Sequence, residues 1–237
     1  MIDFHTHVLP GIDDGSKGTD MSKQMLEESA RQGITKLVAT PHFYAHRESF
    51  DHFLEKREHA IQKVLGIKDR IENIPQLYVG AEVYFFPGMG NAERLPELCI
   101  RGTNLLLLEM PFAQWDKTVA QEVHKIIEKQ KLQVILAHVE RFPGFQKDDK
   151  TWKEITQLPL IFQINTESFS GFRSRHFCLK FMKEHEQMLL GSDTHNMTSR
   201  PQNLKEGRET VAKKLGEEYL AKLDQRGEKL LETATTL

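Results

Sequence analysis

The first seven residues carry two histidines, one residue apart, at the end of a short apolar stretch. His5 and His7 occupy positions i and i+2, which face the same side of a β-strand. Neutral imidazole is the commonest protein ligand for first-row divalent metals, so two imidazoles presented together can chelate one ion. Two surface histidines near a loose N-terminus would have the same sequence, so this stretch alone leaves both a metal site and a plain surface open as interpretations.

Similar residues recur where other predicted strands end. Apolar stretches that alternate with helical patterns predict seven strands, at residues 1–7, 34–40, 76–84, 104–110, 132–137, 160–165 and 188–192. In parallel α/β folds, functional side chains gather at the carboxyl ends of the strands. One such residue alone could be a core histidine or a surface acid, but six of the seven strands carry or lead into metal-ligand types. Beyond the first pair these are His42, Glu82, Glu109, His138, Asp193 and His195.

These eight side chains predict a centre with more than one metal ion. The two glutamates would be costly to bury without cations, because isolated buried carboxylates are strongly disfavoured. Ligands that mix imidazole and carboxylate without thiolate suit Mn²⁺, Fe²⁺ or Zn²⁺ better than Cu⁺, and eight ligands are too many for one ion. Two or three ions are therefore expected, and such clusters commonly activate a bridging water and bind a phosphate in hydrolysis.

Two arginines follow ligand-bearing strand ends. Arg141 lies three residues after His138, and Arg200 lies five residues after His195. A guanidinium group matches phosphate oxygens with bidentate geometry. Either arginine alone would more commonly cap a helix or pair with a surface acid, but together beside a metal centre they indicate phosphate binding.

The order of elements predicts an α/β fold in one domain, built as a barrel-like (β/α) unit from 237 residues. Helices are expected from Thr19 or Ser22 to Gly33, over residues 49–65, 117–129 and 175–186, and along the charged tail from Gln202 onward. The near-continuous apolar strands fit a sheet that is covered on both faces.

Composition argues against several other classes of protein. The chain is 39% hydrophobic and 28% charged, as in ordinary globular proteins, and its net charge of −2 gives no basic field for nucleic acid. No signal peptide is visible, and the longest apolar run, residues 105–108, is far shorter than the roughly 20 residues that cross a bilayer. We therefore expect a cytoplasmic protein that does not insert into a membrane, with Cys99 and Cys178 reduced.

A resemblance to a known family rests on six motifs, which in chain order are HTHVLPGIDDG, ATPHF, GAEVYF, LLLLEMPF, AHVERF and GSDTH. They resemble the polymerase-and-histidinol-phosphatase (PHP) superfamily. More narrowly, residues 1 to about 201 are similar to the bacterial manganese-dependent protein tyrosine phosphatases of capsule and exopolysaccharide operons. The resemblance implies a single PHP domain over residues 1–237, folded as a distorted seven-stranded (β/α)7 barrel. It also implies a trinuclear site, with Mn²⁺ as the expected ion and Fe²⁺, Zn²⁺ or Co²⁺ as alternatives.

Roles for individual residues follow from the same resemblance. The eight ligand candidates match the metal ligands of the family, with Glu82 bridging two ions, and Arg141 and Arg200 match its phosphate-binding arginines. Asp14 matches an acidic position near the site, as a general acid, a partner of a ligand or a loop anchor. The implied reaction is attack of a metal-bridging hydroxide on phosphotyrosine. The implied substrate is the tail of a membrane-associated, autophosphorylating tyrosine kinase that regulates polysaccharide chain length.

Other functions remain open on the sequence. A cysteine-based phosphatase needs an arginine six residues after its nucleophile, but Leu105 and Glu184 occupy those positions after the two cysteines. A small-molecule phosphatase of the same fold, such as one for histidinol phosphate, needs a deep pocket, whereas a phosphotyrosyl peptide needs an open groove. A non-catalytic docking protein with structural metals needs no open coordination position. Aromatic residues that either line a groove for an aromatic ring or simply pack follow the ligands: Phe43, Tyr44, Phe85, Phe86 and Phe112.

Overall fold

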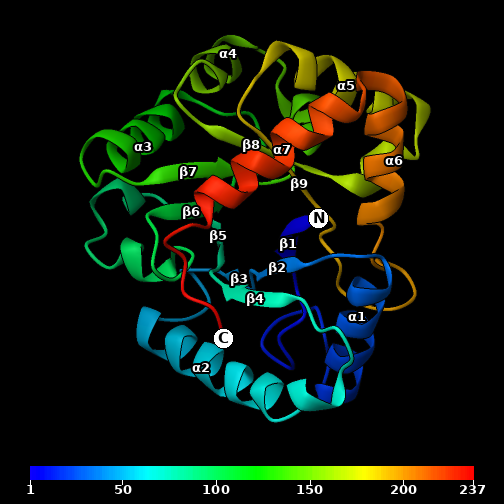
Figure 1. The fold of residues 1–237 in the computed structure, drawn as a ribbon. Helices are drawn as coiled ribbons and strands as arrows, with labels where there is room; N and C mark the ends of the chain where they lie inside the picture. The colour runs from blue at the N-terminus through cyan, green and yellow to red at the C-terminus, as the bar shows by residue number, and fades with distance from the viewer.

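The computed structural model describes residues 1–237, and its strands form a parallel barrel (Figure 1). The strands are β1 (Ile2–Thr6), β2 (Lys36–Ala39), β3 (His42–Phe43), β4 (Gln76–Val79), β5 (Glu82–Tyr84), β6 (Leu105–Glu109), β7 (Gln133–Leu136), β8 (Ile161–Asn165) and β9 (Met188–Gly191). They pair in the orders β1-β2-β4 and β3-β5-β6-β7-β8-β9. Every pairing between these strands is parallel, as expected for strands that alternate with helices.

Two positions in the barrel are occupied by a pair of short strands separated by a bend. The predicted strand at 34–40 is observed as β2 and continues after Pro41 as β3, while the predicted strand at 76–84 is divided at Gly80 into β4 and β5. Pro41 has no amide hydrogen to donate, and a Cβ on Gly80 would lie 3.3 Å from the backbone of Ile100. Backbone hydrogen bonds nevertheless continue across both bends, from Gly80 to Ala39 at 2.9 Å and from Glu82 to Pro41 at 3.0 Å.

The barrel closes between its first and last strands. The amide of Asp193 donates to the carbonyl of His5 at 2.8 Å, and the amide of His7 donates to the carbonyl of Thr194 at 2.9 Å. With each bent pair counted once, seven positions surround the axis. The predicted distorted seven-stranded barrel is confirmed, and its distortion lies at the two bends and in a register shift within β1.

Helices pack around the outside of the barrel (Figure 1). They are α1 (Thr19–Arg31), α2 (Phe50–Leu65), α3 (Lys117–Glu128), α4 (Lys150–Thr156), α5 (Phe172–Glu184), α6 (Leu204–Leu215) and α7 (Glu217–Leu230). Ser49 and Asp116 cap α2 and α3 by accepting from backbone amides, which explains why both were predicted within about a residue. The seven-residue α4 was not predicted. None of the helices is long and apolar enough to cross a membrane.

The barrel interior holds an apolar layer below a polar one. On β6, Leu105 and Leu107 share a face with Glu109 because side chains alternate along a strand. The two leucines belong to a compact buried cluster that includes Leu231, just after α7, and α7 lies across this end of the barrel in Figure 1. A larger cluster fills the space between the barrel and the outer helices. The apolar end is thus closed, and the polar layer lies toward the carboxyl ends of the strands.

Arg57 on α2 holds the bend that precedes Glu82. Its buried guanidinium donates to the carbonyl of Gly80 at 3.0 Å and to that of Glu97 at 2.9 Å. We expect Arg57→Met to lower the free energy of unfolding by about 1–3 kcal/mol, because two carbonyls lose a charged donor. Urea denaturation measures this change. Lys63→Met, at an exposed position of the same helix, is the control and should change it by less than about 0.5 kcal/mol. Equal midpoints for the two variants would contradict this role for Arg57.

Candidate metal centre

The eight predicted ligands lie together at the carboxyl end of the barrel. The Nε2 atoms of His5 and His7 are 3.1 Å apart, and they lie 3.5 and 3.4 Å from Oδ1 of Asp193. Nε2 of His138 lies 2.9 Å from Glu82 and 3.3 Å from Glu109. Three groups of side chains are each close enough to hold an ion: His5, His7 and Asp193; His42, Glu82 and Glu109; and His7, Asp14, His42 and His195.

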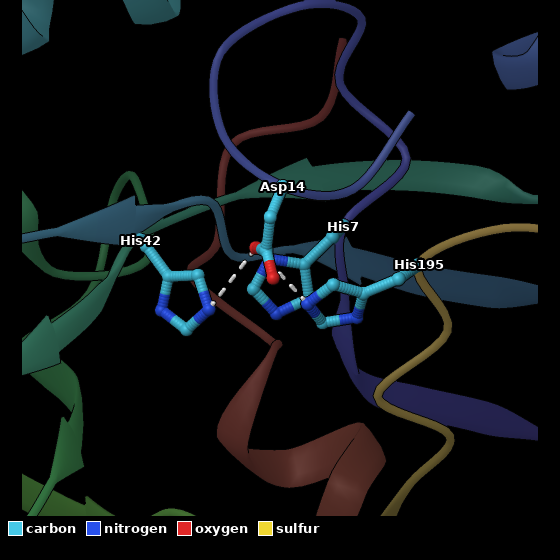
Figure 2. Close-up of side chains that lie close together, drawn as sticks. All are labelled: His7, Asp14, His42 and His195. Atoms are coloured by element: carbon cyan, nitrogen blue, oxygen red, sulfur yellow. Dashed lines mark ion pairs between the residues drawn. The ribbon is translucent and has the colours of Figure 1, made fainter. Parts of the chain in front are cut away.

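Figure 2 shows the third group, in which Asp14 lies between two histidines. Its Oδ1 is 3.5 Å from Nε2 of His42 and 3.3 Å from Nε2 of His195, while its side chain is 63% exposed. The adjacent imidazole of His195 holds the pKa of Asp14 well below its usual range. An ionised carboxylate has no proton to donate, so this geometry favours Asp14 as a ligand or a partner of a ligand over a general acid.

Several buried ligand atoms lack a hydrogen-bond partner. They are Nδ1 of His42, Oε2 of Glu82, Oδ1 of Asp193 and Nε2 of His195. Nδ1 of His42 is nevertheless 3.0 Å from Oε2 of Glu82, so these atoms converge without the geometry of a hydrogen bond. Unpaired buried polar atoms cost about 1–3 kcal/mol each, and divalent cations at the points of convergence would satisfy them. The side chains therefore fit a centre of several metal ions.

The acids and imidazoles of the centre shift the pKa values of one another. Burial alone would raise the pKa of Glu82, but the imidazoles of His5 and His42 hold it well below its usual range. Burial would likewise raise the pKa of Asp193, which His5 and His7 lower instead. Burial would lower the pKa of His138, but the carboxylates of Glu109 and Glu82 raise it to about 9. Without metal the centre therefore keeps ionised carboxylates beside protonated imidazole, and metal binding must displace protons.

Strand β8 is the one position in the barrel that supplies no predicted ligand, yet it connects three of them. Oε1 of Gln163 accepts from Nδ1 of His5 at 3.0 Å and from the amide of His138 at 2.9 Å. The Gln163 amide donates to Asn165 at 2.9 Å, and the Asn165 amide donates to Oδ2 of Asp193 at 2.7 Å. A donor at Nδ1 leaves Nε2 of His5 free to bind a metal. Sequence reasoning missed both residues, although two amides at alternating positions of an apolar strand were the available signal.

Asp13, also missed, supports two further ligands. Its Oδ2 lies 2.7 Å from Nδ1 of His7 and accepts the amide of His42 at 3.1 Å, while Oδ1 accepts the amide of Gly15 at 2.9 Å. The two adjacent aspartates therefore have different surroundings. Asp13 orients His7 from inside the protein, and its neighbour Asp14 faces the opening.

Two ligands have a left-handed backbone conformation that is uncommon for residues other than glycine. His138 has φ of 30° and Asp193 has φ of 54°. Such conformations persist when the surrounding structure holds them, and they concentrate at functional sites. The backbone amide of His138 donates to Gln163, and the backbone amide of Asp193 donates to the carbonyl of His5. These two hydrogen bonds hold the left-handed conformations.

Both predicted arginines reach the centre. Nη2 of Arg141 donates to Oδ2 of Asp193 at 2.9 Å, and Nη2 of Arg200 donates to the same oxygen at 2.6 Å. Their side chains remain 34% and 30% exposed, so each guanidinium keeps donors that face the opening. The structure thus brings both arginines beside the ligands, as the sequence predicted.

The cysteines and most of the noted aromatic residues have no place in the site. Cys99 and Cys178 are buried, and burial raises the pKa of the Cys99 thiol to about 12, so no thiolate nucleophile is available. Phe43 and Phe85 belong to the core. Tyr44 and Phe86 are partly buried, and Phe112 is exposed at 39%.

The barrel fold is shared with proteins of known structure. Amidohydrolase 2 from Bifidobacterium longum subsp. infantis shares the fold at a TM-score of 0.54 and 13% identity, over 98% of each chain. A chain from the crystal structures of YwqE from Bacillus subtilis and CpsB from Streptococcus pneumoniae, described as unique metal-dependent tyrosine phosphatases, is more similar. It aligns with a TM-score of 0.82 and 24% identity over 100% of this chain and 96% of the other.

Comparisons of sequence give the family. The model of the family described as "Capsular polysaccharide synthesis, CpsB/CapC" matches residues 1–232, and the chain belongs to this family. Tyrosine-protein phosphatase CpsB of Streptococcus pneumoniae is 26% identical over 91% of both chains. Tyrosine-protein phosphatase YwqE of Bacillus subtilis is 26% identical over 99% of this chain and 93% of its own length. The predicted family and the predicted enzyme class, a metal-dependent tyrosine-protein phosphatase, are thereby confirmed.

The hydrogen bonds of Gln163 can be tested by metal binding. Gln163→Leu removes the acceptor that orients His5 and His138, so we expect the affinity for Mn²⁺ to fall about 10- to 100-fold. Isothermal titration calorimetry of the metal-depleted protein measures this directly. Gln133→Leu, at an exposed position of the neighbouring strand β7, serves as the control. Equal Mn²⁺ affinity in the two variants would show that the amide does not support the ligands.

Proposed function

We propose that the chain removes phosphate from phosphotyrosine in the tail of a membrane-associated, autophosphorylating tyrosine kinase that controls polysaccharide synthesis, on the cytoplasmic side of the membrane. The observation that carries this proposal is the convergence of three ligand groups and two arginines at one opening of the barrel. Membership of a capsular polysaccharide synthesis family supports the cellular setting. Residues 1–237 act as one phosphatase unit in this proposal.

The metal ions are held, in this proposal, by His5, His7, His42, Glu82, Glu109, His138, Asp193 and His195. Glu82 suits a bridging position, because its Oε2 lies 3.1 Å from His5 and 3.0 Å from His42 while its Oε1 lies 2.9 Å from His138. A shell of imidazole and carboxylate without thiolate suits Mn²⁺, Fe²⁺ or Zn²⁺, and Mn²⁺ is the ion that we propose. When bound, the ions supply an activated water near neutral pH and Lewis acidity toward phosphoryl oxygens.

Arg141 and Arg200 bind the phosphoryl group. Asp193 Oδ2 holds one Nη2 of each guanidinium, so the remaining donors are oriented toward the opening before the substrate arrives. Charge-assisted hydrogen bonds from such preorganised donors stabilise the phosphoryl oxygens as their charge redistributes during transfer. The leaving tyrosyl oxygen has a pKa of about 10, so its departure needs less protonation than that of an alkyl alcohol. This agrees with the ionised state of Asp14.

The opening suits a phosphorylated side chain on a protein better than an enclosed small molecule. Asp14, Arg141 and Arg200 retain exposed fractions of 63%, 34% and 30%. An adjoining cavity of about 570 Å³ extends past His42 to Tyr44 and Arg47. A peptide can therefore approach along the surface while its phosphate reaches the ligands.

Metal removal provides the first test. Chelation should abolish hydrolysis of a phosphotyrosyl peptide, and added Mn²⁺ should restore it. His138→Ala should remain at least about 100-fold less active than the wild-type protein after Mn²⁺ is added. The reason is that the centre loses the imidazole that lies beside the buried carboxylates of Glu82 and Glu109. His124→Ala, a half-exposed histidine of α3, is the matched control. Preference for histidinol phosphate over the peptide would overturn the proposed substrate, and metal-loaded protein inactive on both would indicate a docking function.

The arginines can be tested by substitutions that leave the predicted metal ligands themselves unchanged. Arg141→Lys and Arg200→Lys keep the charge but lose the planar fork, so we expect kcat/KM for the peptide to fall about 10- to 100-fold with unchanged metal content. Steady-state kinetics and elemental analysis measure the two quantities. Arg31→Lys, at a surface position of α1 that is 75% exposed, controls for the substitution itself. Retention of kcat/KM within twofold in both site variants would exclude phosphate binding by these arginines.

A further inference from the structure

Two exposed phenylalanines lie side by side at the rim of the metal centre. Among the large hydrophobic residues of the chain, Phe112, Phe145 and Phe172 are the ones that are exposed, and the first two have exposed fractions of 39% and 42%. The ring centroids of Phe112 and Phe145 are 5.7 Å apart at an interplanar angle of 65°. Adjacent exposed apolar side chains beside a polar opening mark a contact surface for an apolar group.

The two rings are attached to the loops that carry the catalytic machinery. Phe112 lies three residues after Glu109, and Phe145 lies four residues after Arg141. Phe112 also stacks on the imidazole of His138, with centroids 5.9 Å apart and planes at 17°. A group seated on these rings would therefore be connected by a short path to a phosphate held at the centre.

A rigid base supports this pair of rings. Phe142, which is fully buried, lies 5.4 Å from Phe112 and 5.2 Å from Trp115, centroid to centroid. Trp115 is itself buried, and its Nε1 donates to the carbonyl of Pro111 at 2.9 Å, immediately before Phe112. The Phe112 ring is therefore held in place before any ligand binds, which lowers the entropy lost on binding.

Tyr44, another aromatic residue near the centre, is already in contact with two charged or ionisable side chains. The Tyr44 ring stacks on His42, with centroids 5.1 Å apart, and the guanidinium of Arg47 lies over the ring at 4.5 Å from its centroid. Contacts with these two neighbours engage the Tyr44 ring. The Phe112–Phe145 pair, in contrast, is exposed beside the centre and can accept another ring.

We propose that Phe112 and Phe145 bind the phenyl ring of the phosphotyrosyl substrate and make the enzyme select aryl over alkyl phosphates. This inference rests on the proposed phosphatase function and identifies its specificity-determining residues. Aromatic rings attract one another in offset-stacked or edge-to-face arrangements at centroid separations of about 4.5–7 Å, and the angle between the two phenylalanines leaves both arrangements open to a third ring. An alkyl phosphate such as phosphoserine has no ring to place there.

The test compares two phosphonates that cannot be hydrolysed. Calorimetry with the Mn²⁺-loaded protein should show tighter binding of phenylphosphonate than of methylphosphonate. Phe112→Ala and Phe145→Ala should each weaken binding of phenylphosphonate about 3- to 10-fold and leave methylphosphonate unchanged. The ring of Phe145 contacts Phe112 and no predicted metal ligand. The Phe145→Ala variant therefore distinguishes a loss of ring binding from a disturbance of His138. His124→Ala, at the half-exposed histidine of α3, is the control and should change neither.

Outcomes that overturn this proposal differ from those that overturn the phosphatase function. An unchanged preference for phenylphosphonate in both phenylalanine variants would place the ring elsewhere. Turnover of a phosphotyrosyl peptide by the wild-type protein is measured in parallel. If no turnover occurs but the phenylalanine variants lose the phenyl preference, the ring site stands and the proposed reaction falls.

Discussion

The structure of the barrel opening depends on balancing buried charge. Glu82, Glu109 and Asp193 are at most 5% exposed and lie among five imidazoles that converge from different strands. Neither set of side chains is satisfied by the other, since atoms of both remain without hydrogen-bond partners at separations near 3 Å. Divalent cations would resolve this conflict, and the hydrogen bonds behind the predicted ligands would keep each lone pair pointed at the centre.

That requirement shapes the surrounding fold. The bends at Pro41 and Gly80 let His42 and Glu82 begin short strands of their own, so that both side chains turn into the opening. Strand β8 supplies no predicted ligand. It carries Gln163 and Asn165 instead, whose side-chain amides form hydrogen bonds with His5, His138 and Asp193 at the ends of β1, β7 and β9. At the far end, α7 and the apolar layer below the ligands close the barrel. The apolar end of the barrel thus contributes to stability, and the opposite end carries the candidate metal centre.

Much of this arrangement could be predicted from the sequence, because ligand-type residues at the ends of parallel strands must share one edge of the sheet. Arg141 and Arg200, which follow two of these strand ends, lie at the same edge and donate to Asp193. The division of the strand at Gly80 could not be predicted, because it depends on the packing of Gly80 against Ile100, a residue of another segment. The roles of Gln163, Asn165 and Asp13 could not be predicted for a similar reason. The role of a side-chain amide or carboxylate depends on the residue that it hydrogen-bonds to in the folded protein. The same holds for Asp14, whose proximity to His42 and His195 comes from the fold of its loop.

The most direct test of a multinuclear centre is an anomalous difference map from crystals of the Mn²⁺-loaded protein, collected at the manganese absorption edge. We expect two or three peaks at the carboxyl end of the barrel, enclosed by the three ligand groups, with Glu82 in contact with two of them. A map with no peak there would contradict the proposed centre. A single ion bound by histidines alone, with Glu82 and Glu109 left without a cation, would contradict it equally.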